Sequence, residues 1–231
     1  MTGFVLKFIA MCSMVLDHIK YAVPATNNFI TQYFGRLAFP IFAFLISEGM
    51  IHTKSRKKYI LRMFIFACIS QVPFLLFRGL VSQGFVLNVM FTFLFAIIGI
   101  TIFDYFDITK EFPNFLKFIM TALVAISILL MTLAVRMDYG WYGIATVWLF
   151  YVLKDKKILR TIGYIILVIL YYFSRYIGFI NKMDWISLAF ASLPAIIILF
   201  YNGKQGRKLK YFFYLFYPVH MLVLYGLSFI F

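Results

Sequence analysis

Long apolar runs alternate with short polar clusters along almost the whole sequence. A helix needs about 20 mostly apolar residues to cross the hydrocarbon core of a bilayer. Cutting the chain at its charged residues and at groups of Gly, Pro and Asn leaves nine apolar segments: 4–23, 33–51, 58–77, 85–105, 114–135, 140–153, 158–178, 184–201 and 211–230. The pattern predicts an all-α, polytopic transmembrane helix bundle of about nine spans, and boundaries defined only to within several residues also allow eight or ten.

The sixth segment differs from the others in length. It starts at Gly140 and has only about 14 residues, so it is either a half-helix or continues through flanking polar residues. No separate polar domain, low-complexity tract or internal repeat is visible in the sequence. We therefore expect residues 1–231 to form a single transmembrane helical domain.

Composition supports a lipid environment. Hydrophobic residues make up 64% of the chain and charged residues 13%, against about 45–50% and about 25% in soluble domains. Lys and Arg number 22 against 8 acidic residues, which gives a net charge of +14. A soluble protein with this charge would suggest nucleic acid. Here the basic residues lie in short loops between apolar runs, which favours the anionic lipid surface as partner and no nucleic acid.

The same basic residues predict the orientation of the bundle, because short loops rich in Lys and Arg stay in the cytoplasm. With the N-terminus in the cytoplasm, most of the 22 basic residues fall on the cytoplasmic side. Arg36 is then embedded, and the outer side receives only Lys20, Arg78, Arg136, Arg175 and Lys182.

The two cysteines suggest no chemistry. Cys12 and Cys68 lie inside apolar segments without metal-ligand or redox spacing, so we expect them to pack as small hydrophobic residues. The sequence contains no zinc-ligand spacing, Walker loop, dinucleotide-binding glycine pattern or serine-nucleophile elbow.

Ionisable side chains inside the predicted spans are the main functional signal, because each costs about 2.5–3.5 kcal/mol to insert. Asp17 and His18 lie near the outer end of the first span. Arg36 enters the second span from the same side, so the three side chains can meet. The same outer layer also contains Asn88, Asp138 and Tyr139.

Two sets of embedded charged residues can also be explained as structural ion pairs, without any role in catalysis. Asp17 and Arg36 can form a structural ion pair between the first two helices. Near the cytoplasm, Lys7 lies at the depth of Glu48, which His52 follows at i+4, and a Lys7–Glu48 pair would neutralise both charges.

The histidines are harder to explain as structural residues. Histidine exchanges protons near neutral pH. Adjacent helix residues point about 100° apart, so Asp17 is not expected to be the direct partner of His18, and another helix must complete a site there. His220 follows Pro218 in the last span and is either a buried, hydrogen-bonded histidine or a catalyst.

A basic run follows the second span. The run Lys54-Ser55-Arg56-Lys57-Lys58 suits the phosphates of a nucleotide-like cofactor or of lipid head groups. Most runs of this kind are topology signals only.

Several blocks of the sequence resemble one family. They are Leu16-Asp17-His18-Ile19, residues 35–44 with Glu48-Gly49 and His52-Thr53, Arg56-Lys57-Lys58-Tyr59, residues 69–74, residues 88–92, Asp138-Tyr139-Gly140 and Tyr217-Pro218-Val219-His220. These blocks are similar to those of the TraX proteins, polytopic membrane proteins named for the conjugation factor that acetylates the amino terminus of F-type pilin. Gln71 stands where an acidic residue is expected. The layout also resembles, more weakly, other membrane-embedded acyltransferases.

The resemblance implies a multi-pass enzyme of the bacterial cytoplasmic (inner) membrane. It implies acetyl transfer from acetyl-CoA to an amine or hydroxyl of a pilin-like peptide or an envelope molecule such as a glycan, with no metal. His18 would be the general base, Arg36 or Asn88 would stabilise the oxyanion, and Asp17 would hold Arg36. His220 would be a second candidate base or a contact to the donor.

The remaining candidates follow from the same resemblance. Substrate contacts would come from Asn88, Asp138, Tyr139, His220 and Glu48. The CoA phosphates would be bound by Lys54, Arg56, Lys57 and Lys58. The acceptor, the acyl group and the oligomeric state stay open.

Two other classes of function are compatible with the embedded charges. In a proton-coupled transporter they would form a proton relay, with the short sixth segment as a broken helix at the binding site. Two related halves, which many transporters have, are not visible here. In a purely structural or assembly protein all embedded charges would be paired, which His18 and His220 argue against.

Overall fold

The computed structural model describes residues 1–108, 113–176, 184–207 and 210–231, and these residues are mainly helical. The elements in chain order are α1 (Gly3–Ala22), η1 (Pro24–Thr26), α2 (Phe29–Tyr33), η2 (Phe34–Leu37), α3 (Ala38–His52), α4 (Arg56–Arg78), α5 (Val89–Ile108), α6 (Asn114–Ala134), α7 (Gly140–Val152), α8 (Lys157–Arg175), α9 (Trp185–Leu199) and α10 (Lys210–Leu227). Among the described residues, the β structure is limited to one isolated bridge between Leu87 and Met137.

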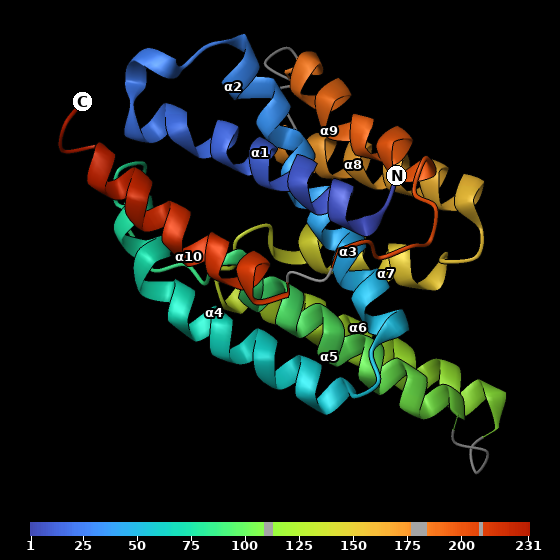
Figure 1. Cartoon of the computed structure of the whole chain (residues 1–231). Helices are drawn as coiled ribbons and strands as arrows, with labels where there is room; N and C mark the ends of the chain where they lie inside the picture. Colours follow the sequence, from blue (N-terminus) through green and yellow to red (C-terminus); the bar gives the residue numbers. More distant parts are fainter. Residues whose placement is uncertain (109–112, 177–183, 208–209) are drawn as a thin grey trace.

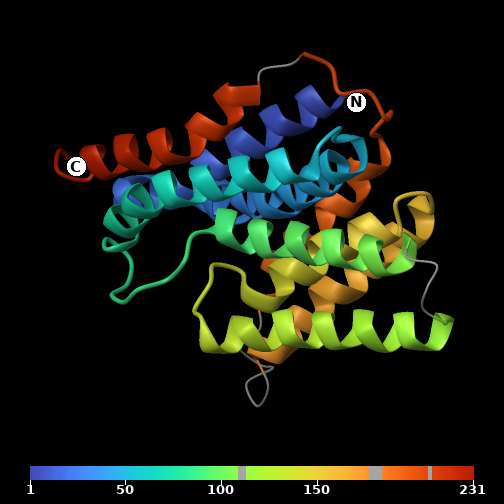
Figure 2. The same ribbon diagram turned by 90° about the horizontal axis from the view of Figure 1, so that it is seen from below.

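The helices pack into a bundle in which the first and last helices are neighbours. Helix α10 lies against α4 and also contacts α1, while α3 packs between α1 and α7 (Figure 1). Helix α5 joins α4 to α7, and α8 pairs with α9. Figure 2, seen from below, shows α6 at one edge of the bundle, next to α5 and α7.

All nine apolar segments predicted from the sequence contain a helix. The second segment is interrupted, because α2 and η2 precede α3, and the sixth is short, with 13 residues in α7. The all-helical prediction is therefore confirmed for the described residues. Lys182, which the orientation argument placed outside, lies beyond them.

Five helical segments of the described chain are long and apolar enough to cross a membrane: Phe29–His52, Arg56–Arg78, Val89–Phe106, Asn114–Ala134 and Lys157–Arg175. The apolar helices Trp185–Leu199 and Tyr211–Leu227 are shorter. Helix α1 has the length but carries Lys7, Asp17 and Lys20. The structure thus supports a multi-pass helical membrane protein, while the count of nine spans and the side of the N-terminus stay predictions.

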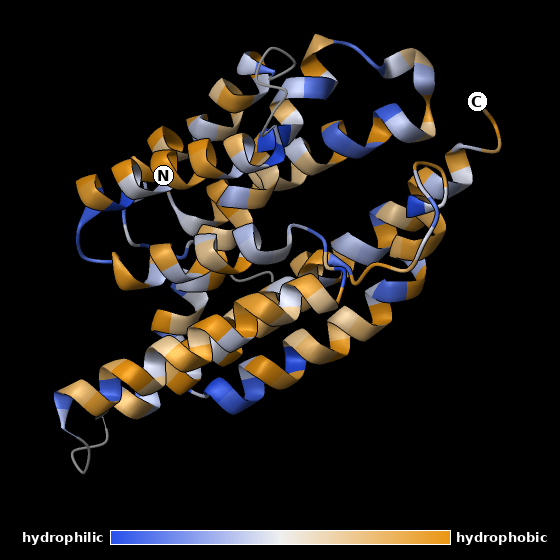
Figure 3. Ribbon diagram, turned by 180° about the vertical axis from the view of Figure 1, so that it is seen from behind, coloured by the Kyte–Doolittle hydropathy of each residue, from blue (hydrophilic) through white to orange (hydrophobic). Residues whose placement is uncertain are grey.

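Apolar side chains cover the outside of the bundle as well as its inside. Figure 3 shows hydrophobic colouring along much of the helical surface, including the long helices α5 and α6. On α6, Phe118, Leu130 and Leu133 are 58–72% exposed. A water-soluble protein rarely exposes apolar patches of this extent, so these faces are suited to lipid.

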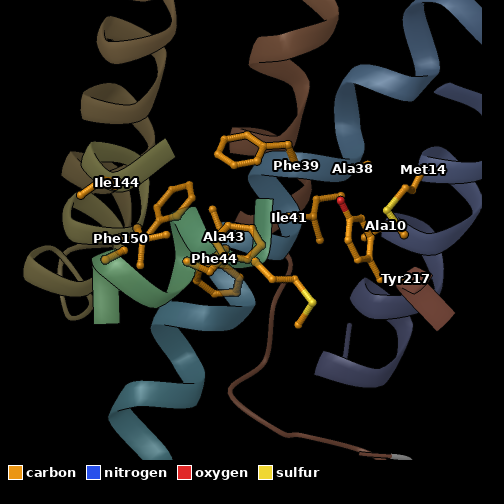
Figure 4. Close-up of a cluster of buried hydrophobic side chains, with 14 of the residues drawn as sticks. Ala10, Met14, Ala38, Phe39, Ile41, Ala43, Phe44, Ile144, Phe150 and Tyr217 are labelled. Atoms are coloured by element: carbon orange, nitrogen blue, oxygen red, sulfur yellow. The ribbon is translucent and has the colours of Figure 1, made fainter. Parts of the chain in front are cut away.

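The buried core centres on α3. Ile41, Ala43 and Phe44 are fully buried there, and the ring of Phe44 meets that of Phe150 of α7 edge to face at 5.7 Å (Figure 4). The cysteines do not join this core. Cys12 and Cys68 are exposed, which corrects the prediction that they pack inside, because the periodicity of an all-apolar helix does not distinguish core from lipid.

Local signals explain where several helices begin. The side-chain oxygens of Thr2, Ser55 and Asp184 accept backbone N–H groups at the starts of α1, α4 and α9. Tyr139 has φ 61°, in the left-handed region, and leads directly into α7. A non-glycine residue there is uncommon, so the turn before α7 is held by its surroundings.

Candidate active site

Two histidines from the first and last helices meet inside the bundle. The Nδ1 atom of His18 on α1 lies 2.9 Å from the Nε2 atom of His220 on α10, and the rings stack with centroids 5.2 Å apart. The Nδ1 atom of His220 lies 2.9 Å from the backbone oxygen of Phe216. His18 and His220, called the histidine pair below, are the partners that the sequence alone could not assign to each other.

Aromatic rings surround the histidine pair. His220 is 7% exposed and stacks on the ring of Phe216 at 5.0 Å. The ring of Phe77 on α4 lies 5.3 Å from that of His18. The contact between α10 and both α4 and α1 therefore places two proton-exchanging groups in mostly apolar surroundings.

Asp17 forms an ion pair within its own helix. Its carboxylate lies 2.8 Å from the ammonium group of Lys20, which is itself buried. The expected ion pair with Arg36 is therefore not found among the described ion pairs, because Lys20 takes that place one turn along α1. The Arg36 side chain is exposed and still interacts electrostatically with Asp17, Tyr139 and Tyr172.

Gly35 brings η2 unusually close to α1 at Asp17. A Cβ atom added at Gly35 would lie 2.5 Å from the Cβ atom and 2.7 Å from the Cα atom of Asp17. Only glycine fits at such a backbone approach. The position of the residue before His18 is thus set by direct contact with η2.

Asn88 does not have the free donor that an oxyanion site requires. Its Nδ2 atom donates to the backbone oxygen of Ala67 and to Oε1 of Gln71, both at 2.8 Å, and its Oδ1 accepts from the backbone of Met90. Both amide hydrogens are committed, so the proposed oxyanion role of Asn88 is wrong for this geometry. Asn88 instead caps α5.

The hydrogen bonds of Gln71 account for an amide at this position, where the family pattern has an acidic residue. Its amide nitrogen donates to the backbone oxygen of Val86 at 2.8 Å, while its Oε1 accepts from the backbone and side chain of Asn88. An ionised carboxylate accepts but cannot donate. The amide is therefore the form that satisfies both neighbours.

Asp138 and Tyr139 organise the turn between α6 and α7. The backbone N–H of Asp138 donates to Leu87 at 2.9 Å, its backbone oxygen accepts from Thr92, and the ring of Tyr139 stacks on Phe39 with centroids 3.7 Å apart. Burial raises the pKa of the Asp138 carboxyl to about 6, against the opposing influence of Arg78. Both residues are partly accessible, and their substrate contacts stay predictions.

A cavity of about 390 Å³ lies between α1, α3, α4, α5 and α10. The charged residues that line it are Lys7, Glu48, His52, Arg62 and Arg207. Its uncharged wall includes Met14, Met63, Val89, Met90, Phe93, Tyr201, Tyr214 and Tyr217.

One end of the cavity is basic. Lys7 lies over the ring of Phe213 at 4.8 Å, and Arg62 hydrogen-bonds to Tyr214 at the next position of α10. Arg207 lines the cavity from the segment that precedes α10. These three cations, called the basic end below, come from α1, α4 and the α9–α10 connection.

Glu48 lines the same cavity from α3 and is paired there. Its carboxylate lies 3.3 Å from Nε2 of His52 and hydrogen-bonds to Tyr201. The predicted Lys7–Glu48 pair is therefore not formed among the described ion pairs, because equal depth in the bundle did not make the two side chains face each other. Glu48 does lie in the cavity wall.

The predicted phosphate-binding run lies beside the cavity, between the lining residues Thr53 and Tyr59. Lys54, Arg56, Lys57 and Lys58 are all absent from the cavity lining. Arg56 forms an ion pair with Asp104 and a hydrogen bond to Tyr151, which ties α4 to α5 and α7. The predicted binding of phosphates by this run stays a prediction.

The other end of the cavity approaches the histidine pair. Met14 lies four residues before His18 on α1, and Tyr217 lies three residues before His220 on α10. These spacings are about 6 Å and about 4.5 Å along a helix axis. Tyr217 is 7% exposed, and its hydroxyl oxygen faces the backbone N–H of Val89, while no acceptor for the hydroxyl hydrogen is found in the described structure.

Sequence reasoning missed three residues of this site: Arg62, Arg207 and Tyr217. Arg62 was used only as one of the cytoplasmic charges that orient the bundle, although it lies inside an apolar helix, six residues after the first residue of α4. Tyr217 was visible as part of the block that contains His220, but a tyrosine among so many aromatic residues gives little signal. Among the described residues, no group of three or more His, Cys, Asp or Glu side chains is placed to hold a metal ion.

The fold and the site define a helical membrane protein with a part-buried histidine pair close to a cavity that three cations line. The TraX protein family model matches residues 2–228, so the chain belongs to the TraX family. The chain is 28% identical to the probable fimbrial assembly protein FimC, serogroup H1, of Dichelobacter nodosus, over 96% of this chain and 94% of that protein. No solved structure matches the chain.

Proposed function

We propose that this protein is a membrane-embedded acyltransferase of the bacterial cytoplasmic membrane. It would transfer an acetyl group from acetyl-CoA to an amine or hydroxyl of a pilin-like peptide or another envelope molecule. Its nine helical segments would each enter the membrane, with the N-terminus and the basic end of the cavity in the cytoplasm. The TraX resemblance and the fimbrial assembly name of the relative support this acceptor class.

One observation carries the proposal. A single cavity connects three cations at one end with the neighbourhood of two hydrogen-bonded histidines at the other. An acyl-CoA has the matching order of groups, since its phosphates are joined to the thioester by a long, mostly uncharged arm. From Phe213, which lies beside Lys7, to His220 the rise along α10 is about 10 Å.

The donor would enter with its phosphates last. Arg62, Arg207 and Lys7 would bind the phosphates through charge-assisted hydrogen bonds, which are the strong ones. The arm would lie against Met63, Met90 and the neighbouring aromatic rings. The thioester would then reach the inner end, near Tyr217.

The chemistry would need a base and a donor to the developing oxyanion. His18 would take the proton of the acceptor amine or hydroxyl as that atom attacks the thioester carbonyl carbon. The hydroxyl of Tyr217 would donate to the carbonyl oxygen as negative charge develops there. The C–S bond would then break, and His18 would return its proton to the departing sulfur to give free CoA.

The acceptor would come from the opposite end of the histidine pair. That end holds Asp17, Lys20 and Arg36, together with the turn that contains Asp138. If the donor and the acceptor reach the histidine pair from opposite sides, an acceptor outside the membrane can react with a cytoplasmic donor, and neither molecule has to cross the membrane.

The test is acceptor-dependent release of CoA by the purified full chain in detergent. Labelled acetyl-CoA is incubated with peptides that have a free amino terminus and with sugar acceptors. We expect turnover in the native protein and a loss of about 100-fold or more in His18→Ala. Native-like turnover in His18→Ala would remove His18 from the mechanism. No turnover with any acceptor, together with proton-coupled solute uptake into liposomes, would favour a transporter.

A further inference from the structure

We propose that His220 is a positioning residue that fixes the tautomer of His18, so that the Nε2 atom of His18 carries the reactive lone pair. The catalytic part of this inference rests on the proposed acyl transfer. The tautomer itself depends only on the geometry of the histidine pair.

The first step concerns the proton on His220. Its Nδ1 atom lies 2.9 Å from the backbone oxygen of Phe216. A carbonyl oxygen only accepts hydrogen bonds, so Nδ1 of His220 must carry a proton. A neutral imidazole holds one proton, and its other nitrogen, Nε2, is then an acceptor.

The second step assigns the proton on His18. The Nε2 atom of His220 lies 2.9 Å from Nδ1 of His18, and two nitrogens at this distance share one proton. With Nε2 of His220 as acceptor, Nδ1 of His18 is the donor. A neutral His18 therefore has its lone pair on Nε2, which makes no hydrogen bond to the described chain.

The alternative is a doubly protonated His220. It would donate from both nitrogens and would turn His18 into the other tautomer, with Nε2 protonated and unable to act as a base. This form would place a cation in a site that is 7% exposed, stacked on Phe216. No carboxylate lies within ion-pair distance of either ring among the described residues. A buried charge without a partner is strongly disfavoured.

The consequence for the reaction is a division of roles. The Nε2 atom of His18 receives the acceptor's proton as the new bond to the carbonyl carbon forms, and gives it to sulfur as the C–S bond breaks. The Nδ1–H of His18 stays bonded to His220 throughout and keeps the ring in place, as the partner of a catalytic histidine does elsewhere. His220 neither gains nor loses a proton during turnover.

The spectroscopic test uses the small number of histidines. The chain contains three, so ¹⁵N-histidine NMR of the full chain in liposomes gives few signals, which histidine variants assign. We expect both His18 and His220 to carry the proton on Nδ1. In His220→Leu the acceptor is lost, and His18 should move toward the Nε2-protonated form that free imidazole side chains prefer.

Two further variants separate positioning from general damage. His220→Gln keeps an acceptor oxygen near the former Nε2 position and should retain the Nδ1–H form of His18. Val219→Leu changes the neighbouring residue, which is 52% exposed, and should leave the spectrum unchanged. An Nε2-protonated His18 in the native protein would overturn the proposal, as would an Nδ1-protonated His18 in His220→Leu.

Activity provides the second readout. His220→Leu should lower kcat by about 100-fold with little change in the KM for acetyl-CoA, and His220→Gln should recover most of the loss. Equal kcat in the Leu and native proteins would refute the positioning role. If the native spectrum is as expected but no acceptor is acetylated, the proposed function fails while the tautomer assignment stands.

Discussion

Replacing Gly35 by alanine tests whether the close contact between η2 and α1 positions the histidine pair. The added Cβ atom would lie 2.5 Å from the Cβ atom and 2.7 Å from the Cα atom of Asp17. Carbon atoms normally pack at about 3.5–4.0 Å, so the two segments must separate by about 1 Å. Because one of the crowded atoms is backbone, a side-chain rotation cannot relieve the contact.

The magnitude follows from two effects of this displacement. Overpacking of a tight contact costs about 1–3 kcal/mol of stability. A shift of about 1 Å at a reacting group can cost about 100-fold in rate, and Asp17 is the residue before His18. We therefore expect Gly35→Ala to lower both the thermal unfolding temperature and the acyl-transfer kcat.

The assay compares Gly35→Ala with Gly226→Ala in the same detergent. At Gly226, in α10, an added Cβ atom meets nothing within 4 Å. The same chemical change there should leave activity unchanged and raise helix stability by at most about 1 kcal/mol. A Gly35→Ala protein with native unfolding temperature and native kcat would refute the idea that this contact holds His18 in place.

Three other substitutions address separate parts of the site. Tyr217→Phe should lower kcat by about 10²–10³-fold and lower the unfolding temperature only slightly, since among the described residues its hydroxyl loses one contact, with the backbone N–H of Val89; an unchanged kcat would exclude it as the oxyanion donor. Arg62→Gln should raise the KM for acetyl-CoA by about 10–100-fold, the value of one charge-assisted hydrogen bond. It should leave acetyl-pantetheine, which lacks the nucleotide phosphates, unaffected, and equal effects on both donors would contradict phosphate binding there. Burial raises the pKa of Asp138 to about 6, so its stabilising contribution is complete below the ordinary value of 3.8 and is lost as pH rises through about 6. The unfolding temperature of the native protein should therefore fall between pH 4 and pH 7 by an amount that Asp138→Asn lacks, and identical pH curves would disprove this.

Helix positions followed closely from the sequence, because apolar length alone determines where a chain can be helical in lipid. The short α7 was expected from its run of apolar residues, which ends at the polar cluster after Val152. The break at η2 was not expected. It depends on the contact of Gly35 with Asp17, a residue on another helix, and no local pattern reports such a contact.

The interaction partners of individual side chains were predicted from the sequence much less well than the helices. Hydropathy gives the depth of a residue, but not the direction in which its side chain points. Lys7 and Glu48 share a depth, yet Lys7 lies over Phe213 and Glu48 pairs with His52. Asp17 was likewise predicted to pair with Arg36, but Lys20 lies one turn along α1 and reaches the carboxylate from the same helix.

The cost of burying charged and polar side chains was the most informative rule. It selected His18 and His220, which the structure brings together over 202 positions of sequence. It also selected Asn88, whose amide proved to be needed by Ala67 and Gln71. The rule finds side chains with a reason to be buried, but it cannot distinguish a helix cap from a reactive group.

The contact between α1 and α10 has a consequence for biosynthesis. Ribosomes add about 5–20 residues per second, so roughly 10–40 seconds separate the emergence of these two helices. During that interval the nascent chain contains His18 without the residue that fixes its tautomer. Under the proposed acyl transfer, full reactivity toward a thioester would appear only when the final segment joins the bundle, and an incomplete polypeptide would be nearly inactive.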